Sequence, residues 1–237
     1  APRNAQGKML TTHDLALVAT EEITKRFADL PDLEFASRYA IGKLLWELGD
    51  LKNAKLQLEQ SLEVYDSLGN EGSTSHWLLT SLAYSKVLLD LGDSVNAKEI
   101  AQAVIERSIA EYGLESEKVL KAKYLLSEIL AFSYDHEGAL ELQREIVDAV
   151  DAGVSLSYEF ELDVRVSLTG ALFLSHMLSG AGEETRPLLE ECLQTIELLV
   201  PTINKDLGAL HPISIDARLI LASCLMQVMR IDESVPI

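Results

Sequence analysis

Histidines, cysteines and paired acids are the side chains of this sequence that could bind a metal, act as a nucleophile or transfer a proton. The five histidines lie in separate segments, and none stands at metal-ligand spacing from a cysteine, a carboxylate or another histidine. We therefore expect capping, turn or packing roles for them. They are His13, His76, His136, His176 and His211.

Acidic pairs occur at Glu21-Glu22, Glu183-Glu184 and Glu190-Glu191. Adjacent residues of a helix do not face one another, so these pairs lack the convergent geometry of general acid–base catalysis. The sequence also contains no glycine-rich phosphate loop, no Gly-x-Ser-x-Gly turn and no zinc motif. We expect no catalytic residue, no cofactor site and no metal site, and hence no enzyme.

Two cysteines, Cys192 and Cys224, are too few for a disulfide framework and fit a reducing compartment. They could be two buried thiols or a disulfide, and the sequence leaves their distance open. Residues 1–7 show no signal peptide, and the longest apolar stretch, near 168–178, is too short to span a bilayer. These features predict a cytoplasmic protein.

The formal net charge is −18, from 38 acidic and 20 basic residues. This charge disfavours nucleic acids and anionic membranes as partners. It either keeps the surface solvated or favours basic and weakly charged partners.

Helices are the elements that must position any functional side chain. Leucine, alanine, glutamate and serine dominate the sequence, and alternating β-branched patterns are rare. Leu15, Val18 and Ile23 follow helical spacing in a first helix that we expect to run to about Leu30 and to be ended by Pro31. No strand is predicted.

A short signature recurs with a period near 42 residues. Its closing alanines lie 43 and 42 residues apart, which indicates stacked helix pairs. The segments are Leu48-Gly49-Asp50 before Ala54, Leu91-Gly92-Asp93 before Ala97, and Ser133-Tyr134-Asp135 before Ala139.

This pattern resembles the tetratricopeptide repeat (TPR). That family places a small residue in the first helix, a bulky one three positions later, glycine at the turn and alanine early in the second helix. Small residues let the two backbones approach. The matching residues are Gly42, Leu45, Gly49 and Ala54; Ser85, Leu88, Gly92 and Ala97; Ser127, Leu130, Tyr134 and Ala139; a weaker set of Phe173, His176, Gly180 and Thr185; and Ser223 and Met226 of a lone last helix.

The long period is similar to the kinesin light chain subtype of this repeat. Residues 111–116 and 206–212 resemble its inter-repeat linker, and residues 137–147 resemble its second helix. The likeness covers about residues 34–231. The paired asparagines with which that subtype often clamps a peptide backbone are not present at the matching first-helix positions. Similar repeats also occur in large bacterial and fungal signalling proteins.

The resemblance implies an all-α fold, a right-handed α-α superhelix of antiparallel helix pairs in a TPR-like solenoid. We expect a leader or remnant at 1–10, an N-terminal helix within 11–32, repeats at 33–72, 73–114 and 115–156, an irregular repeat at 157–209 and a partial repeat at 210–237.

The family's concave face is lined by first helices. It would carry Tyr39, Lys43, Trp46, Leu82, Lys86, Leu89, Lys121, Tyr124, Glu128, Phe132, Leu174 and Met177. These side chains either pack on neighbouring helices with solvated lysines, or form a trough for an extended or helical peptide with an acidic or carboxylate group.

The implied function is a protein- or peptide-binding scaffold module of a larger signalling or adaptor protein. A self-association module and a ligand-sensing regulatory domain are the alternatives. The expected partner is a protein or peptide, with no nucleic acid and no membrane, and a homo-oligomer is possible.

Overall fold

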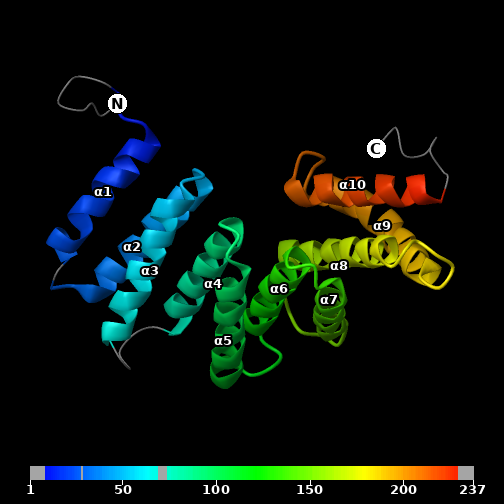
Figure 1. Ribbon diagram of the computed structural model, residues 1–237, viewed down its shortest axis with the longest axis horizontal. Coiled ribbons are helices and arrows are strands. Elements are labelled where there is room, and N and C mark those ends of the chain that lie inside the picture. Colours follow the sequence, from blue (N-terminus) through cyan, green and yellow to red (C-terminus); the bar gives the residue numbers. More distant parts are fainter. Residues whose placement is uncertain (1–8, 28, 69–73, 229–237) are drawn as a thin grey trace. The chain divides into compact units, whose positions relative to one another are not determined.

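The computed structural model describes residues 9–27, 29–68 and 74–228, and these residues form ten α-helices and no β-strand (Figure 1). The helices are α1 (Thr12–Phe27), α2 (Pro31–Glu47), α3 (Leu51–Leu68), α4 (Thr74–Asp90), α5 (Ser94–Tyr112), α6 (Glu117–Phe132), α7 (His136–Asp151), α8 (Tyr158–Leu178), α9 (Arg186–Asp206) and α10 (Pro212–Gln227). The prediction of an all-α fold is confirmed.

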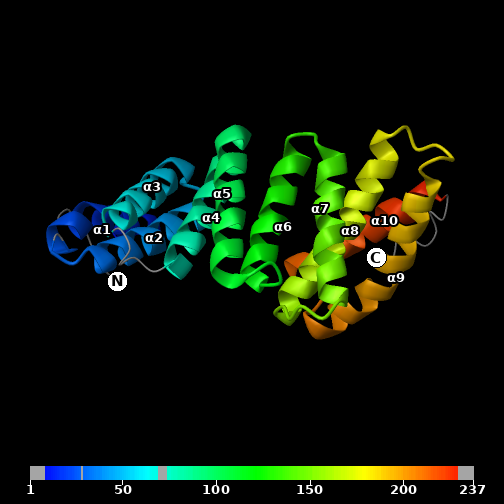
Figure 2. The same cartoon turned by 90° about the horizontal axis from the view of Figure 1, so that it is seen from below.

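The chain divides into two compact units, residues 1–108 and 109–237, and α5 crosses the boundary. In unit 1, α1 packs on α2, α2 on α3, and α3 on α4. In unit 2, each helix from α6 to α10 packs on the next, and α8 also contacts α10 (Figure 2). We call α2, α4, α6, α8 and α10 first helices, and α3, α5, α7 and α9 second helices. The second helices α3, α7 and α9 thus each pack both on their own first helix and on the following one.

Each signature turn ends one helix and begins the next. The N–H of Gly49 donates to the carbonyl of Trp46, and the N–H of Asp50 donates to the carbonyl of Leu45, both at 2.9 Å. Gly49 has a φ of 79°, a left-handed conformation that glycine adopts without steric cost. The Asp50 carboxylate then accepts the N–H of Asn53 at 3.2 Å and caps α3.

The other two signature turns repeat this scheme. Gly92 and Asp93 make the same two backbone bonds at 2.9 Å, and Asp93 caps α5. In the third turn Tyr134 replaces glycine with a φ of 64°, and Asp135 accepts the N–H of Gly138 at 3.0 Å. Because Tyr134 has a Cβ, this left-handed conformation costs about 1–2 kcal/mol.

The turn of the fourth pair, between α8 and α9, resembles the three signature turns more closely in structure than in sequence. The N–H of Ala181 donates to the carbonyl of His176 at 3.0 Å, as Asp50 does to Leu45, and Gly180 has a φ of 92°. His176 therefore occupies the place of the bulky leucine and is only 4% exposed. Its Nδ1 lies 2.9 Å from the Thr185 hydroxyl.

Close approach of helices explains the small residues of the signature. A Cβ at Gly42 would lie 2.8 Å from Cγ and 3.3 Å from the backbone N of Leu58, on α3. In the next pair, the Ser85 hydroxyl donates to the carbonyl of Ala97 at 2.7 Å. A large side chain at either position would separate the two helices.

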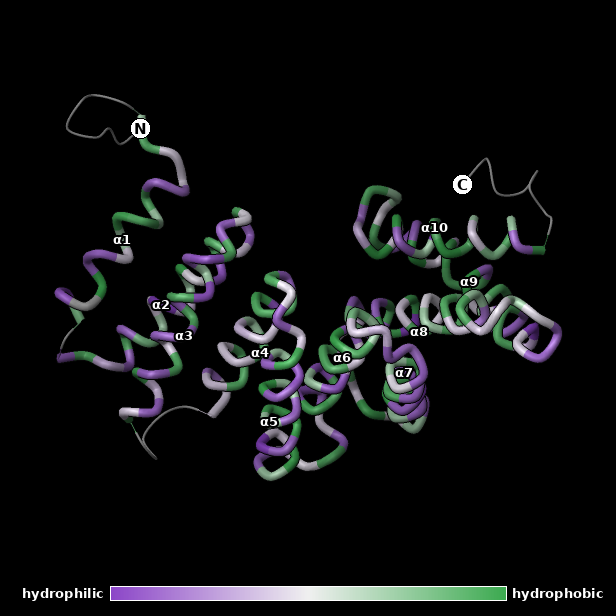
Figure 3. The backbone as a smooth tube through the Cα atoms, in the orientation of Figure 1, coloured by the Kyte–Doolittle hydropathy of each residue, from purple (hydrophilic) through white to green (hydrophobic). Residues whose placement is uncertain are grey.

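Apolar and polar residues alternate along the turns of the helices (Figure 3). This pattern lets each helix bury one apolar stripe. In unit 1, one buried cluster gathers Leu45, Leu58 and Val87 from α2, α3 and α4. In unit 2, a larger cluster includes Ile146 and Leu172. Because every helix shares its core with its neighbours, the hydrophobic contacts run along each unit.

A buried arginine sits inside the first helix pair. The Arg38 side chain is 5% exposed and donates to Glu34 at 2.8 and 2.9 Å within α2. It also donates to Gln57 at 2.9 Å and Gln60 at 2.6 Å on α3. These acceptors compensate the burial of its charge.

The first helix boundary was predicted wrongly. Pro31 does not end the first helix. It is the first residue of α2, where its missing N–H costs no hydrogen bond and its fixed φ suits the helix. Of the expected leader at 1–10, residues 1–8 lie outside the described residues, as do residues 229–237 of the expected partial repeat.

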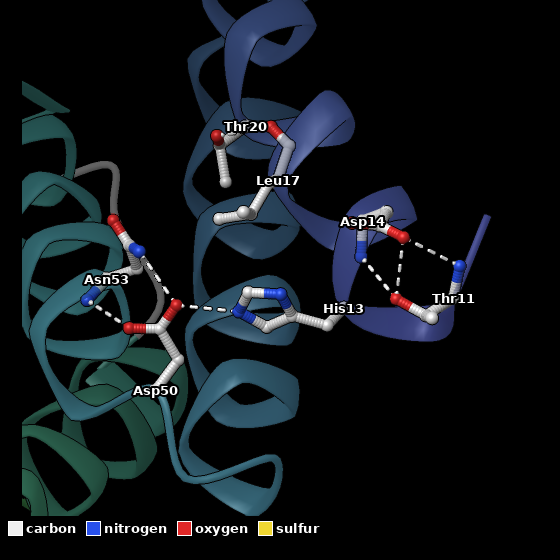
Figure 4. Close-up of polar contacts among 7 residues, drawn as sticks. All are labelled: Thr11, His13, Asp14, Leu17, Thr20, Asp50 and Asn53. Atoms are coloured by element: carbon white, nitrogen blue, oxygen red, sulfur yellow. Dashed lines mark hydrogen bonds and ion pairs between the residues drawn. The ribbon is translucent and has the colours of Figure 1, made fainter. Parts of the chain in front are cut away.

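Helix α1 is joined to the first signature turn by a polar contact (Figure 4). His13 Nε2 lies 2.7 Å from Asp50 Oδ2, and the same oxygen accepts the Asn53 amide at 2.7 Å. Asp14, at the start of α1, accepts from the N–H and hydroxyl of Thr11. The aspartate that caps α3 thus also fixes α1.

Candidate binding faces on the first helices

Half of the twelve predicted binding residues lie in unit 1. Tyr39, Lys43 and Trp46 share one face of α2, and Leu82, Lys86 and Leu89 share one face of α4, both at helical spacing. The two rows are neighbours, because Trp46 Nε1 donates to Asp90 Oδ2 at 2.6 Å, next to Leu89. Trp46 is therefore oriented by an internal hydrogen bond.

Many of the candidate side chains on α2 and α4 are partly buried by packing within unit 1. Tyr39 and Trp46 are partly buried against the cluster around Leu45. Leu82, Lys86 and Leu89 are also only partly exposed. Lys43 is exposed, and its Nζ lies 3.9 Å from Glu47.

The other six candidates lie in unit 2. Lys121, Tyr124, Glu128 and Phe132 follow one face of α6, and Leu174 and Met177 lie near the end of α8. The structure thus brings each set of six onto two neighbouring first helices.

Tyr124 joins these two helices. Its O–H lies 2.7 Å from the Ser167 hydroxyl, and its ring meets the ring of Phe160 edge to face at 5.5 Å between centroids. Burial, followed by the charges of Asp163 and Glu128, raises the pKa of the Tyr124 hydroxyl well above its ordinary value. Tyr124 therefore stays neutral and acts as a packing residue.

Phe132 and Leu174 are the apolar candidates that face solvent, with 57% and 43% of their surfaces exposed. Lys121 is exposed too, but its Nζ lies 2.8 Å from Glu117 and 5.4 Å from the Phe160 ring centroid. Two of the three candidate lysines, Lys43 and Lys121, are thus paired with a glutamate four residues away. Their positive charge is balanced locally.

Two hollows are lined by residues that the sequence did not single out as binding candidates. One, of about 340 Å³, is lined by His176, Arg186, Gln227 and neighbours in unit 2. Another, of about 400 Å³, lies between α1 and α2 in unit 1. Helical spacing on one element cannot reveal them, because each is formed by more than one element.

The two cysteines meet in the core of unit 2. Both are free and buried, and their Sγ atoms are 3.1 Å apart. The hydrogen bond to Cys224 and burial raise the pKa of the Cys192 thiol. The Cys192 S–H also lies 3.2 Å from the carbonyl of Thr169, so the pair links α8, α9 and α10.

Within residues 9–27, 29–68 and 74–228, no three His, Cys, Asp or Glu side chains gather as metal ligands. None of the helices described there has both the length and the apolar character to cross a bilayer.

Solved structures show the same fold. A Podosopora anserina protein assigned as a kinesin light chain, with nearly identical TPR-like repeats, has a TM-score of 0.64 and 16% identity over 86% of this chain and 90% of its own. A variant of it gives a TM-score of 0.65 at the same identity and coverage. BtubC (BKLC) from P. vanneervenii has a TM-score of 0.68 and 17% identity over 93% of this chain and 84% of its own.

No family model and no curated protein matches the sequence. The structural likenesses show an all-α, TPR-like superhelical repeat fold of the kind seen in kinesin light chain-like proteins. The predicted resemblance is confirmed at the level of the fold.

Proposed function

We propose that this chain is a protein-binding scaffold module that holds a peptide on the face of its first helices. The observation that carries the proposal is the exposure of Phe132 and Leu174 on this face of a TPR-like fold. Exposed aromatic and aliphatic side chains act as anchors at protein interfaces. This fold is typically a non-catalytic scaffold, and binding rather than catalysis is the function that we assign.

The favoured ligand is an apolar segment of weak or positive charge. The face is acidic around Tyr124, since Glu128 lies on α6 and Asp163 lies on α8. The lysines Lys43 and Lys121 are already paired, so an acidic peptide would gain little from them. A cytoplasmic location accompanies this proposal, because both cysteines are free thiols.

Two surface substitutions test the proposal. The double variant Phe132→Ala, Leu174→Ala should bind selected peptides at least about tenfold more weakly, because it removes two apolar anchors. Peptides would first be selected from a displayed library on the wild-type chain, and affinities measured by fluorescence polarisation.

The matched control is Leu198→Ala, which truncates a leucine 72% exposed on α9, a second helix. Its affinity should equal that of the wild type. Equal loss in the control and the double variant, or no loss in either, would contradict binding on the first helices.

A further inference from the structure

The two cysteines form a close pair between α9 and α10. The Sγ atoms of Cys192 and Cys224 are 3.1 Å apart, and both side chains are free thiols with 0% of their surface exposed. The two helices pack directly on one another, so the backbones that carry the sulfurs are neighbours. A disulfide has a sulfur–sulfur distance of about 2.0 Å, so the atoms need to approach by about 1 Å. Rotation of the two side chains can supply a movement of this size.

Core packing alone does not require a cysteine on α10. The carbonyl of Cys224 accepts the N–H of Val228, the residue that follows the helix. The same place in the other first helices of known turn is taken by Val87 in α4, Ile129 in α6 and Ser175 in α8. The place thus accepts aliphatic or hydroxyl side chains, and what distinguishes the thiol of Cys224 is its chemistry and its partner.

The pair is chemically asymmetric. The Cys192 S–H lies 3.2 Å from the carbonyl of Thr169 on α8. The hydrogen bond from Cys192 lowers the pKa of the Cys224 thiol, while the bond to Cys224, together with burial, raises the pKa of Cys192. Cys224 is therefore the sulfur that ionises first. Because a thiolate rather than a thiol attacks an oxidant, Cys224 is the nucleophile of the pair.

A hollow lies one helical turn from the pair. It has a volume of about 340 Å³, and its lining includes Leu189 of α9 and Gln227 and Val228 at the end of α10. Leu189 precedes Cys192 by three residues, a separation of about one turn. Cys224 lies in the last turn of α10, and helix ends open locally at low cost. A small oxidant in the hollow can therefore reach Cys224 when this turn opens.

We propose that Cys192 and Cys224 are a redox modification site, which hydrogen peroxide converts into a reversible disulfide between α9 and α10. The Cys224 thiolate attacks one oxygen of the peroxide, the O–O bond breaks, and hydroxide leaves and is protonated to water. The Cys192 sulfur then attacks the sulfenic sulfur of Cys224, so the S–S bond forms as the S–O bond breaks, and a second water leaves with the Cys192 proton. The two thiols lose two electrons, and the peroxide gains them.

The disulfide changes how α9 is held. It joins α9 to α10 covalently and removes the S–H that Cys192 directs at the carbonyl of Thr169 on α8. Closing the loop from residue 192 to residue 224 restricts the unfolded chain, so oxidation opposes the opening of α10. In a reducing compartment such a bond is transient and signals the presence of the oxidant.

Peroxide treatment of the reduced full chain tests the site. Hydrogen peroxide should lower the intact mass of the monomer by two hydrogen atoms, and a digest without reductant should contain Cys192 and Cys224 in one linked peptide. Dithiothreitol should restore both thiols. Amide hydrogen exchange in α10 should slow at least about tenfold in the oxidised chain, because the disulfide ties this helix to α9.

A glutathione redox buffer measures whether the fold itself favours the bond. The equilibrium constant for disulfide formation should be at least about tenfold higher in the folded chain than in the same chain unfolded in urea, because the fold holds the two sulfurs together. This comparison uses the wild-type chain alone, so it does not depend on the folding of any variant.

Single variants identify the nucleophile. Cys192→Ser should stop at the sulfenic acid of Cys224, which dimedone traps as an adduct, since the serine hydroxyl can still donate to the Cys224 sulfur. Cys224→Ser should react with peroxide at least about tenfold more slowly, because burial still raises the pKa of the Cys192 thiol. Ser175, at the same place in α8, indicates that this position tolerates serine, and circular dichroism checks the helix content of both variants.

Survival of both thiols in millimolar peroxide would overturn the proposal. Oxygen adducts on the wild type without a linked peptide would overturn it equally, as would an equilibrium constant no higher in the folded chain than in urea, because the two thiols would then be packed core residues and nothing more. Equal reaction rates of the two serine variants would contradict the assignment of Cys224 as the nucleophile.

Discussion

At the scale of single residues, the turn signature could be predicted from the sequence, but the capping bonds of its aspartates could not. Gly49 and Gly92 predict a helix end, because glycine is the usual residue in the left-handed position that follows a helix. The spacing places a helix start just after Asp50 and Asp93, but the hydrogen bonds by which these carboxylates cap it are seen only in the structure. Arg38 was also unpredictable, since its buried acceptors come partly from another helix.

Gly42 gives the sharpest test at this scale. Gly42→Leu should lower the free energy of unfolding by about 1–3 kcal/mol, because the new side chain would overlap Leu58. Urea denaturation followed by circular dichroism measures this change. Gly182→Leu is the control, since a Cβ there meets no atom within 4 Å, and it should change stability by less than about 0.5 kcal/mol. Equal stability of the two variants would refute the close helix crossing.

At the scale of elements, periodicity predicted the helix pairs but not every boundary. The error at Pro31 arose because a proline fits both beyond the end of one helix and in the first turn of the next. The fourth pair matched the signature weakly because His176 occupies the position of a leucine. Its ring nitrogen Nδ1 is paired with the Thr185 hydroxyl. The contacts of α1 with the turn at Asp50 involve residues 37 positions apart and leave no local pattern.

The attachment of α1 should depend on pH through Asp50. Hydrogen bonds from Asn53, then from His13, lower the pKa of Asp50 in the folded protein below its ordinary 3.8. The ionised form is therefore favoured by folding. Its stabilisation is complete above the ordinary pKa and is lost as the pH falls through the lower folded value.

Urea denaturation of the wild type and of Asp50→Asn between neutral pH and pH 2 would measure this dependence. The stability difference between them should shrink as the pH falls. Asn53→Ala should reduce the dependence more than His13→Ala, because the Asn53 bond is the larger cause. A difference that stays constant down to the lowest pH would contradict the assignment.

At the scale of the whole molecule, the 42-residue period predicted the fold because each helix pair of a repeat protein packs only on the adjacent pairs. The binding face could be placed on the first helices, but which side chains remain exposed could not. Trp46 and Tyr124 are the aromatic residues that spacing favours, yet both make hydrogen bonds to the adjacent first helix. Exposure at Phe132 and Leu174 depends on which neighbours reach them.

Nearest-neighbour packing also predicts that damage stays local. Arg38→Ala should destabilise the chain by about 3 kcal/mol, since it leaves Glu34 and Gln57 without their buried donor. Native-state hydrogen exchange should accelerate in α2 and α3, while α8 and α9, in the other unit, keep their protection. Uniform acceleration along the whole chain would instead indicate one cooperative domain.

The three-residue signature turn has a consequence for how such a chain can change in length over evolution. Leu48, Gly49 and Asp50 set the angle between two helices through their backbone bonds and the Asp50 side chain. The geometry of the turn is therefore determined by a short stretch of sequence. When a gene segment of one period is duplicated or deleted, complete turns therefore still connect the helices on either side. Tyr134, which occupies the glycine place in the third turn, shows that the geometry survives loss of the preferred residue once the flanking bonds are in place.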